Sequence, residues 1–396
     1  MASSHPFELR WGIISTGKIA RSFVADLLID PKSRNVHDVV HKVIAVGSRN
    51  LATAEEFVNE YVKCEKSIRA YGSYGEVYAD KDVDVVYIGT PHAFHYENAL
   101  GAIKAKKHVL CEKPVTLNAA ELRSLLDAAK EQGVFFMEAL WTRFLPITME
   151  IKKLAESDCG LGEPVALQAD LSIYFRLDEL PKTHRLLDPY LGGGALLDLG
   201  PYPLLWAILA LYEHPSNKNS RPSHVTGAML RTPLTGVDRS TSFIVTFGTT
   251  SSSASNTLAA QAVLSCNFHT PSFQDGVVIR YENGVIVVHA PIFRPKAFTV
   301  QWYDPDEPGD IVHEDIERFD YVGNGMYFEA DEVARCVRDG KMESEVWGHD
   351  KSLLEMMIFD EIRQQNGYEF PPGVEKVDSG QYTLCKHNHP SPAPGK

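Results

Sequence analysis

Residues 10–20 read RWGIISTGKIA and join a short apolar strand to the start of a helical pattern. In dinucleotide-binding domains, such a turn is where backbone N–H groups and a helix N-terminus meet a pyrophosphate. In the G-x-G-x-x-G frame the glycine positions hold Ser15, Gly17 and Ala20, so the match is degenerate, and simple packing is an alternative explanation. The stretch predicts a dinucleotide-binding turn. Its expected contacts are Ser15, Thr16, Gly17, Lys18 and Ile19.

Strand and helix patterns alternate through the first third of the chain. The run VDVVYIG at 83–89 is too apolar for a half-exposed strand, which is typical of a central parallel strand. One helix begins after Asn118, a good N-cap with Glu121 three residues on, and ends before Gly133. This alternation predicts a parallel sheet of βαβ units. The expected strands are 10–14, 42–47, 83–89, 108–111 and 134–136, and the other helices are 18–29, 51–62 and 93–107.

The pattern changes beyond about residue 150. Apolar residues alternate from Val165 to Ile173, the period of a half-buried strand, and Asn283-Gly284 between two β-rich runs predicts a hairpin. These features predict an open, mainly antiparallel sheet accompanied by helices. Further strands are expected at 242–247, 261–268, 276–281, 285–290 and 298–303, helices at 198–211, 326–338 and 351–365, and loops at 214–224 and 249–257.

The fold class is therefore α/β, with two domains, as the length of 396 residues favours. Residues 1–145 are predicted to form a Rossmann dinucleotide-binding domain. Residues 146–375 are predicted to form an α+β domain with the open sheet. The polar segment 376–396, which contains proline and glycine, is predicted to be disordered.

Composition and charge exclude several classes of function. The net charge of −13 provides no overall basic surface for nucleic acid. The six cysteines form no C-x-x-C pair, which indicates free thiols in a reducing compartment, and no secretory pattern is visible. The longest apolar run, around 204–211, is short of the ~20 residues of a membrane helix and indicates a buried helix. We expect a cytoplasmic protein with no nucleic-acid or membrane partner.

The end of the second strand bears on the cofactor. NAD enzymes usually place an acidic residue there for the ribose 2′-hydroxyl, whereas this chain has Ser48 and Arg49. A serine and an arginine can hydrogen-bond and neutralise a 2′-phosphate, which a carboxylate would repel. An ordinary solvated arginine is the alternative. The pair favours NADP as the cofactor.

A second motif follows the fourth expected strand. Glu112-Lys113-Pro114 lies at the carboxyl end of the strand at 108–111, and Thr90-Pro91-His92 and His95 follow the previous one. Together they resemble the glucose–fructose oxidoreductase/inositol dehydrogenase (Gfo/Idh/MocA) family, over about residues 9 to 372. The resemblance implies that Lys113 sits beside the nicotinamide and the reacting hydroxyl. It also implies cofactor contacts from Thr90, Pro91, His95, Glu112 and Lys113.

A third match is GGGALLDLGPY at 192–202. Asp198 and Tyr202 are four residues apart and would project from one face of a helix. Many members carry histidine where this chain has Tyr202. Tyrosine at this position is typical of the branch of the family that contains dimeric dihydrodiol dehydrogenase and the NADP-dependent D-xylose 1-dehydrogenases. The sequence of residues 137–144 is similar to that branch as well. Residues implied to line the substrate pocket are Trp141, Phe175, Arg185 and Asp188, although core packing and a structural ion pair are alternatives.

The chemistry of alcohol oxidation suggests roles for these residues. A free tyrosine has a pKa of about 10, and a nearby ammonium favours its phenolate. Tyr202 is therefore predicted to be the general base and Lys113 the group that lowers its pKa, although these two roles could be exchanged. Asp198 is predicted to orient Lys113 or a substrate hydroxyl, with a helix cap as the alternative. No metal ion is required.

The resemblance implies an NADP-dependent dehydrogenase for a small molecule. The first expectation is oxidation of D-xylose at C1 to D-xylono-1,5-lactone. The alternative is a trans-1,2-dihydrobenzene-1,2-diol dehydrogenase, which needs a flatter, more aromatic pocket. A non-catalytic NADP-sensing regulator is the third possibility, and it is disfavoured because Lys113 and Tyr202 are both present. A homodimer through the open sheet is implied as well.

Overall fold

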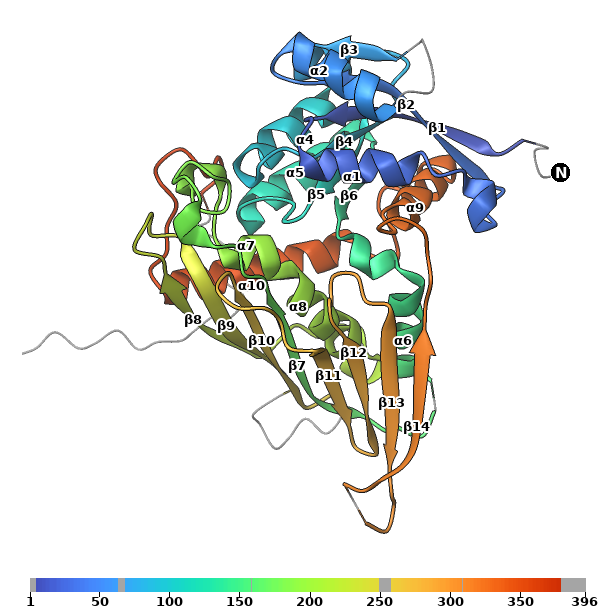
Figure 1. Cartoon of the computed structure of the whole chain (residues 1–396), viewed down its shortest axis with the longest axis vertical. Helices are drawn as coiled ribbons and strands as arrows, with labels where there is room; N and C mark the ends of the chain where they lie inside the picture. Colours follow the sequence, from blue (N-terminus) through green and yellow to red (C-terminus); the bar gives the residue numbers. More distant parts are fainter. Residues whose placement is uncertain (1–4, 63–67, 158, 249–257, 308, 379–396) are drawn as a thin grey trace, which may run out of the picture.

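The computed structural model describes residues 5–62, 68–157, 159–248, 258–307 and 309–378 (Figure 1). Two sheets, one of six strands and one of eight, organise these residues. The loop predicted at 249–257 and residues 379–396 of the predicted tail lie outside the described residues.

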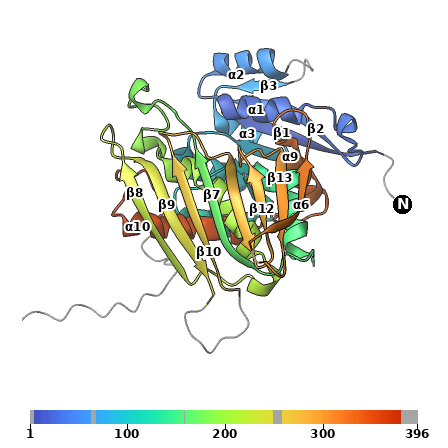
Figure 2. The ribbon, with the colours of Figure 1, turned by 60° about the horizontal axis from the view of Figure 1, so that its bottom comes forward.

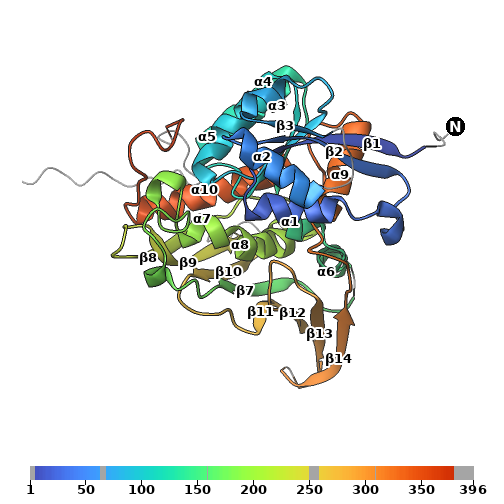
Figure 3. The same ribbon diagram turned by 45° about the horizontal axis from the view of Figure 1, so that its top comes forward.

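The first sheet has the strand order β3-β2-β1-β4-β5-β6, and all its strands run parallel. Figure 3 shows α3, α4 and α5 on one face of this sheet and α1 and α2 on the other. The strand order reverses between β1 and β4, which is where ligands bind on open α/β sheets. This is the Rossmann arrangement that the alternating pattern predicts. The strands are β1 Phe7–Ile14, β2 Val39–Gly47, β3 Arg69–Tyr71, β4 Val85–Ile88, β5 His108–Glu112 and β6 Phe136–Ala139, and the helices are α1 Lys18–Leu27, α2 Leu51–Phe57, α3 Tyr74–Ala79, α4 His95–Lys104 and α5 Ala119–Gln132.

The capping residues predict the bounds of α5 correctly, whereas the predicted start of β6 is too early. Asn118 caps the helix by accepting a hydrogen bond from the N–H of Glu121, and Gly133 ends it in the left-handed conformation with φ 66°. The N–H of Val134 then returns to the carbonyl of Ala129. Because this bond still belongs to the helix end, β6 begins later than the predicted strand at 134–136. The short β3 and α3 have no counterpart in the sequence prediction.

The second sheet has the order β14-β13-β12-β11-β7-β10-β9-β8, with β7 and β10 parallel and the other neighbours antiparallel. The helices α7, α8 and α10 lie between this sheet and the first domain, and Figure 2 shows the opposite face without a helix over it. The open, mainly antiparallel sheet is thus confirmed. Its strands are β7 Pro164–Ser172, β8 His224–Arg231, β9 Asp238–Phe247, β10 Ala260–Asn267, β11 Asp275–Tyr281, β12 Gly284–His289, β13 Ala297–Tyr303 and β14 Ile311–Arg318.

The hairpin predicted at Asn283-Gly284 joins β11 to β12, where Tyr281 pairs with Gly284. The two edge strands, β8 and β14, are missing from the prediction. All eight residues of β14 are exposed, so it lacks the alternation that marks a half-buried strand. The helices after residue 145 are α6 Pro146–Glu156, α7 Ala195–Leu199, α8 Pro201–Ala207, α9 Tyr327–Arg338 and α10 His349–Gln365, with the π-helix η7 at Ile208–Tyr212; α6 was not predicted. Of these, α9 packs on β1 and β2 of the first sheet.

The helix predicted at 198–211 is divided between α7, α8 and η7. Pro201 has no N–H to donate, so the ladder of hydrogen bonds is interrupted between α7 and α8. The whole apolar segment Pro189–Tyr212 is 24 residues long, which is longer than the run recognised in the sequence and long enough to span a membrane. Its apolar window is entirely buried inside the protein, which is the environment of a core helix.

The start of the predicted tail is ordered against α5. The backbone N–H of Lys376 donates to Glu121, and the carbonyl of Val377 accepts from the side-chain amide of Asn118. These bonds give Lys376 and Val377 fixed partners at the start of the segment that is predicted to be disordered.

Candidate active site

The turn between β1 and α1 lies at the carboxyl edge of the first sheet, beside the point where strand order reverses. Ser15, in the first glycine position, has φ 89°, a conformation that usually favours glycine. The side-chain oxygen of Ser15 accepts a hydrogen bond from the N–H of Gly17. A β-carbon on Gly17 would meet nothing closer than that oxygen at 3.5 Å, so the surface above the turn is open.

The donors at this turn suit a pyrophosphate. The ten-residue helix α1 begins after Gly17 with no side-chain cap and no acidic residue in its first turn. Its first N–H groups and the positive end of the helix dipole therefore lack a negative partner from the described chain. Thr16 is half-buried, and Gly17, Lys18 and Ile19 are exposed, so all can be reached from solvent. The turn fits the phosphate part of a nicotinamide dinucleotide.

Ser48 and Arg49 follow β2 at the same edge. Ser48 is buried, and its N–H donates to the carbonyl of Tyr71, whereas Arg49 is exposed. The next residue, Asn50, caps α2 through its side chain. The charge of Arg49 is felt at the half-buried phenol of Tyr74, where it opposes the rise in pKa that burial causes. The strand end thus offers a cation and no carboxylate to a ribose.

Lys113 reaches from the end of β5 to the second domain. Its Nζ donates to the backbone carbonyl of Asp198 at 2.6 Å and lies 3.6 Å from the Oδ1 of that residue. The same Nζ lies 5.1 Å from the centre of the Tyr202 ring. The break between α7 and α8 does not separate Asp198 from Tyr202, and the structure brings both to the predicted lysine.

Asp198 lies among cationic and neutral donors. Its Oδ1 accepts from the Nη1 of Arg185 at 2.7 Å, and the Nε2 of His92 is 3.8 Å away. Burial opposes ionisation, but Arg185 and Lys113 outweigh it and hold the pKa of Asp198 below its usual range. Burial lowers the pKa of His92 to about 3, so this histidine is neutral. The alternative role as a helix cap is not what the side chain does, because it caps no N–H in α7.

An aromatic wall borders Tyr202. The indole N–H of Trp141 donates to the Tyr202 hydroxyl at 3.2 Å. Phe293 lies beside both rings, with centroid distances of 5.8 Å to Tyr202 and 6.1 Å to Trp141. Phe293 comes from the connection between β12 and β13 and was missed because no motif surrounds it.

The protonation of the central pair differs from the prediction. Burial raises the pKa of Tyr202, and the lowering effect of Lys113 is smaller, so the net direction is upward. Burial pulls the pKa of Lys113 down, but Tyr202 and Asp198 outweigh it and the pKa rises. Lys113 thus has the predicted lowering effect on the pKa of Tyr202, but burial outweighs it. The pair is an ammonium beside a neutral phenol.

Two further predicted site residues, His95 and Asp188, form hydrogen bonds within the protein. His95 is fully buried, and its two ring nitrogens each lie 2.8 Å from a carbonyl oxygen, one of Pro114 and one of Thr90, so its ring lies between these loops and donates to one of the two carbonyls. Asp188 accepts a hydrogen bond from the N–H of Tyr190 through Oδ1, and Arg185 pairs with Asp198 instead of Asp188.

The other predicted site residues are Thr90, Pro91, Glu112 and Phe175, and the structure gives each of them the following surroundings. Thr90 is buried with its hydroxyl bonded to Asn98, and Pro91 is half-buried. Glu112 is buried and bonded to Tyr87. Phe175 packs against Phe268, with 5.3 Å between the ring centroids.

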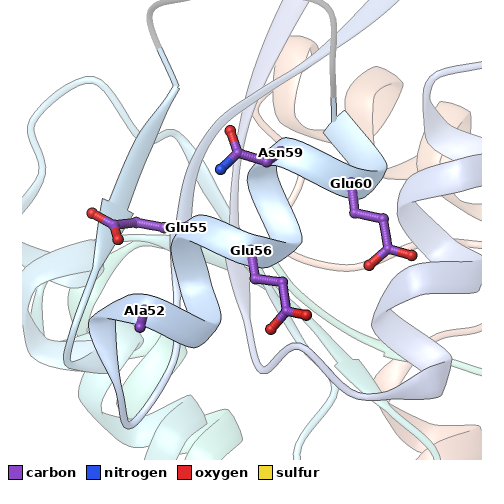
Figure 4. Close-up of a pocket in the computed structure, with 5 residues that line it drawn as sticks. All are labelled: Ala52, Glu55, Glu56, Asn59 and Glu60. Atoms are coloured by element: carbon purple, nitrogen blue, oxygen red, sulfur yellow. The ribbon is translucent and has the colours of Figure 1, made fainter.

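A surface hollow of about 620 Å³ lies on α2 and η2 (Val58–Val62), away from this cluster (Figure 4). Its lining consists of Ala52, Glu55, Glu56, Asn59 and Glu60. The three glutamates on α2 and η2 repel an anionic ligand, and the lining of the hollow contains none of the reactive groups above.

Comparisons with known proteins show what this chain is similar to. Residues 9–140 match a family model described as an oxidoreductase family with an NAD-binding Rossmann fold. A D-xylose 1-dehydrogenase (NADP(+)) from Hypocrea jecorina is 37% identical over 390 residues, covering 94% of this chain and 95% of that protein. A trans-1,2-dihydrobenzene-1,2-diol dehydrogenase from Danio rerio is 34% identical over 360 residues, covering 91% and 97%.

A crystal structure of aldose-aldose oxidoreductase from Caulobacter crescentus, complexed with glycerol, superposes with a TM-score of 0.72. It is 20% identical and covers 90% of this chain and 97% of that one, so it supports the fold. The fold and the matches define the class: the protein is an oxidoreductase with an NAD-binding Rossmann domain. Within that class, the chain belongs to the glucose–fructose oxidoreductase/inositol dehydrogenase (Gfo/Idh/MocA) family.

Proposed function

We propose that this oxidoreductase uses NADP to oxidise D-xylose at C1 to D-xylono-1,5-lactone. The observation that carries the proposal is the convergence of Lys113, Asp198 and Tyr202 from two domains at the carboxyl edge of the Rossmann sheet. The similarity to the fungal D-xylose 1-dehydrogenase (NADP(+)) supports the choice of substrate.

The side chains have complementary parts in this reaction. An oxidised nicotinamide dinucleotide held at the turn of Ser15 to Ile19 would supply the acceptor for the C1 hydride and a positive charge. The Tyr202 oxygen, in its phenolate form, takes the proton of the C1 hydroxyl. Lys113 has three N–H donors and uses one on Asp198, so it can donate another to the substrate oxygen. In the reverse direction the neutral phenol is the proton donor.

Arg185 is the residue best placed to bind the other hydroxyls of a sugar. One of its nitrogens is held by Asp198, while 48% of the side chain is exposed. A guanidinium has five N–H donors in a rigid plane, so those not used on Asp198 can serve the substrate.

The second candidate is trans-dihydrodiol oxidation, which the aromatic wall of Trp141, Tyr202 and Phe293 favours. NADPH formation measured with pentoses, hexoses and a benzene trans-dihydrodiol, using NADP and NAD in parallel, distinguishes the two. We expect the highest kcat/KM with D-xylose and NADP. A higher value with the dihydrodiol would replace the substrate assignment. NADP binding without turnover across the panel would indicate the regulator instead.

The preference for NADP is proposed to come from Arg49 and Ser48. Replacing Arg49 by alanine should raise KM for NADP about 10- to 100-fold, because a hydrogen bond to a charged group contributes ~1.5–3 kcal/mol. KM for NAD should stay the same. Steady-state kinetics with both cofactors measures this, with Arg318→Ala on exposed β14 as the matched control. An equal rise for both cofactors would refute the role in 2′-phosphate recognition.

A homodimer through the open sheet face is also proposed. Cross-strand pairing lines up Ile244, Val263, Gln168, Val278 and Val287 in one row across five strands. Val263, within this row, is 45% exposed. A second copy of the chain would bury the row.

Light scattering should therefore give twice the chain mass. Val263→Arg should shift the protein to monomer, because an unpaired charge would be buried in the interface. Val322→Arg, at a 65% exposed loop position off the sheet, should leave the mass unchanged. A monomeric wild type at micromolar concentration would contradict the proposal.

We further propose a cytoplasmic location, which cell fractionation tests. Supporting it, the cysteines in the described part of the chain are free thiols: Cys111, Cys159, Cys266 and Cys336.

A further inference from the structure

The ring of His92 lies where the two domains meet. His92 begins η3 (His92–Phe94), the 3₁₀ turn that follows β4, and it is 8% exposed. Its Nδ1 lies 2.9 Å from the backbone carbonyl oxygen of Gly192, in the second domain. A carbonyl oxygen can only accept a hydrogen bond, so Nδ1 is the ring nitrogen that carries the proton.

Gly192 makes this contact possible. It follows η6 (Pro189–Leu191) and has φ 74°, in the left-handed region that favours glycine. A β-carbon at this position would lie 2.9 Å from the Cβ of His92 and 2.7 Å from the Cδ2 of Leu117. The backbone can therefore approach the imidazole only because residue 192 has no side chain, and this approach fixes the tautomer of His92.

The second ring nitrogen of His92, Nε2, faces the carboxylate of Asp198. It lies 3.8 Å from Oδ1, which is too far for a hydrogen bond, and it has no hydrogen-bond partner within the described residues. Burial lowers the pKa of His92 to about 3, so the ring is neutral and has a single N–H. Because that N–H is at Nδ1, Nε2 offers a free lone pair.

Two hydrogen-bond donors lie beside this acceptor. The Nη1 of Arg185 and the Nζ of Lys113 lie 2.7 and 3.6 Å from the same Oδ1 that Nε2 faces. Both cations have further N–H groups to donate. A hydroxyl both donates and accepts, so a hydroxyl bound here can donate to Nε2 while it accepts from one of the cations. A hydrogen atom in its place would leave Nε2 without a partner.

We propose that His92 is a specificity-determining residue that accepts a hydrogen bond from the hydroxyl on the carbon next to the one oxidised. This inference rests on the proposed function, in which Lys113 and Tyr202 hold the reacting hydroxyl. Because His92 and Lys113 approach the same carboxylate oxygen, the two hydroxyls that they bind belong to neighbouring carbons. D-xylose has such a hydroxyl at C2, and a trans-dihydrodiol has one beside its reacting carbon, so both candidate substrates meet the requirement.

Substrates with and without this hydroxyl test the proposal. In the wild type, kcat/KM for D-xylose should exceed that for 2-deoxy-D-xylose about 10- to 100-fold, because the analogue leaves a buried acceptor unpaired. His92→Asn should reduce this ratio by about fivefold or more. The asparagine amide N–H can replace Nδ1 on Gly192, but no atom of asparagine reaches the position of Nε2. His92→Gln has a longer side chain that can place an acceptor there, so it should restore part of the ratio.

The control for these variants is His313→Asn on the exposed strand β14, which should keep the wild-type ratio. Thermal unfolding of His92→Asn should stay close to that of the wild type, because the contact with Gly192 is retained. If His92→Asn lowers kcat/KM equally for both sugars, or changes neither value, the residue has no part in recognising the hydroxyl and the proposal is wrong.

A second readout needs no turnover. Nitrogen-15 NMR of labelled histidines, with His92→Asn used to assign the signals, should show a protonated Nδ1 and a bare Nε2 at neutral pH. In the dead-end complex with NADPH, D-xylose should shift the Nε2 signal and 2-deoxy-D-xylose should not. A proton on Nε2 in the free protein, or turnover of D-xylose without this shift, would overturn the inference. A bare Nε2 in a protein that oxidises neither D-xylose nor the benzene trans-dihydrodiol would instead count against the proposed function alone.

Discussion

Replacing Lys113 by alanine is expected to lower kcat by about a hundredfold or more, the scale of a positioned group in proton transfer. The variant loses the cation that stabilises the substrate oxygen as its proton leaves. It also leaves Asp198 with Arg185 as its one close cation, since the Lys113 contacts at 2.6 and 3.6 Å disappear. Rapid-reaction measurement of NADPH formation reports the chemical step.

NADP binding should largely survive in Lys113→Ala, because the proposed phosphate and ribose contacts lie on β1, α1 and β2. Fluorescence titration with NADPH measures it. Lys341→Ala, which removes an exposed lysine paired with Glu345, is the matched control and should keep wild-type kcat. Near-wild-type turnover in Lys113→Ala would exclude the proposed role of the lysine.

Tyr202→Phe is expected to lower kcat by a similar factor of about a hundred or more, because the ring remains while the proton acceptor is lost. The indole N–H of Trp141 also loses its partner, and an unsatisfied buried donor costs about 1–3 kcal/mol. Denaturant unfolding should detect this cost. Measuring kcat at a temperature where the variant is fully folded separates chemistry from stability.

The remaining activity of Tyr202→Phe should also lose its dependence on pH in the alkaline range. Burial raises the pKa of Tyr202. In the wild type, kcat for oxidation should therefore increase as the pH approaches the pKa of this phenol. A phenylalanine cannot titrate. Retention of both the rate and the pH profile in the variant would assign proton transfer to another group, with Lys113 as the first candidate.

The fold was largely predictable because its signals are local. The strand–turn–helix at 10–20, the cap of Asn118 and the hairpin at Asn283-Gly284 each need only neighbouring residues. Elements on the edges escaped prediction. β14 is exposed along its whole length, and nothing in its residue pattern requires a strand until β13 pairs with it.

The candidate site was predictable in part. Family motifs identified Lys113, Asp198 and Tyr202, but the partner of Arg185 follows from tertiary packing, and the structure gives it Asp198 in place of nearby Asp188. Phe293 joins the site from a loop without a motif. The direction of the Tyr202 pKa depends on the degree of burial, which spacing along a sequence does not contain.

The central claim is that Lys113 and Tyr202 act on one alcohol beside the nicotinamide, and transfer of an isotope tests it most directly. The wild-type protein would be incubated with NADP and D-xylose carrying deuterium at C1, and the dinucleotide examined by mass spectrometry. We predict one deuterium in the NADPH formed by the wild type, and a rate of its formation reduced at least a hundredfold in Lys113→Ala and Tyr202→Phe. Unlabelled NADPH from the wild type, or equal rates in all three proteins, would contradict the account.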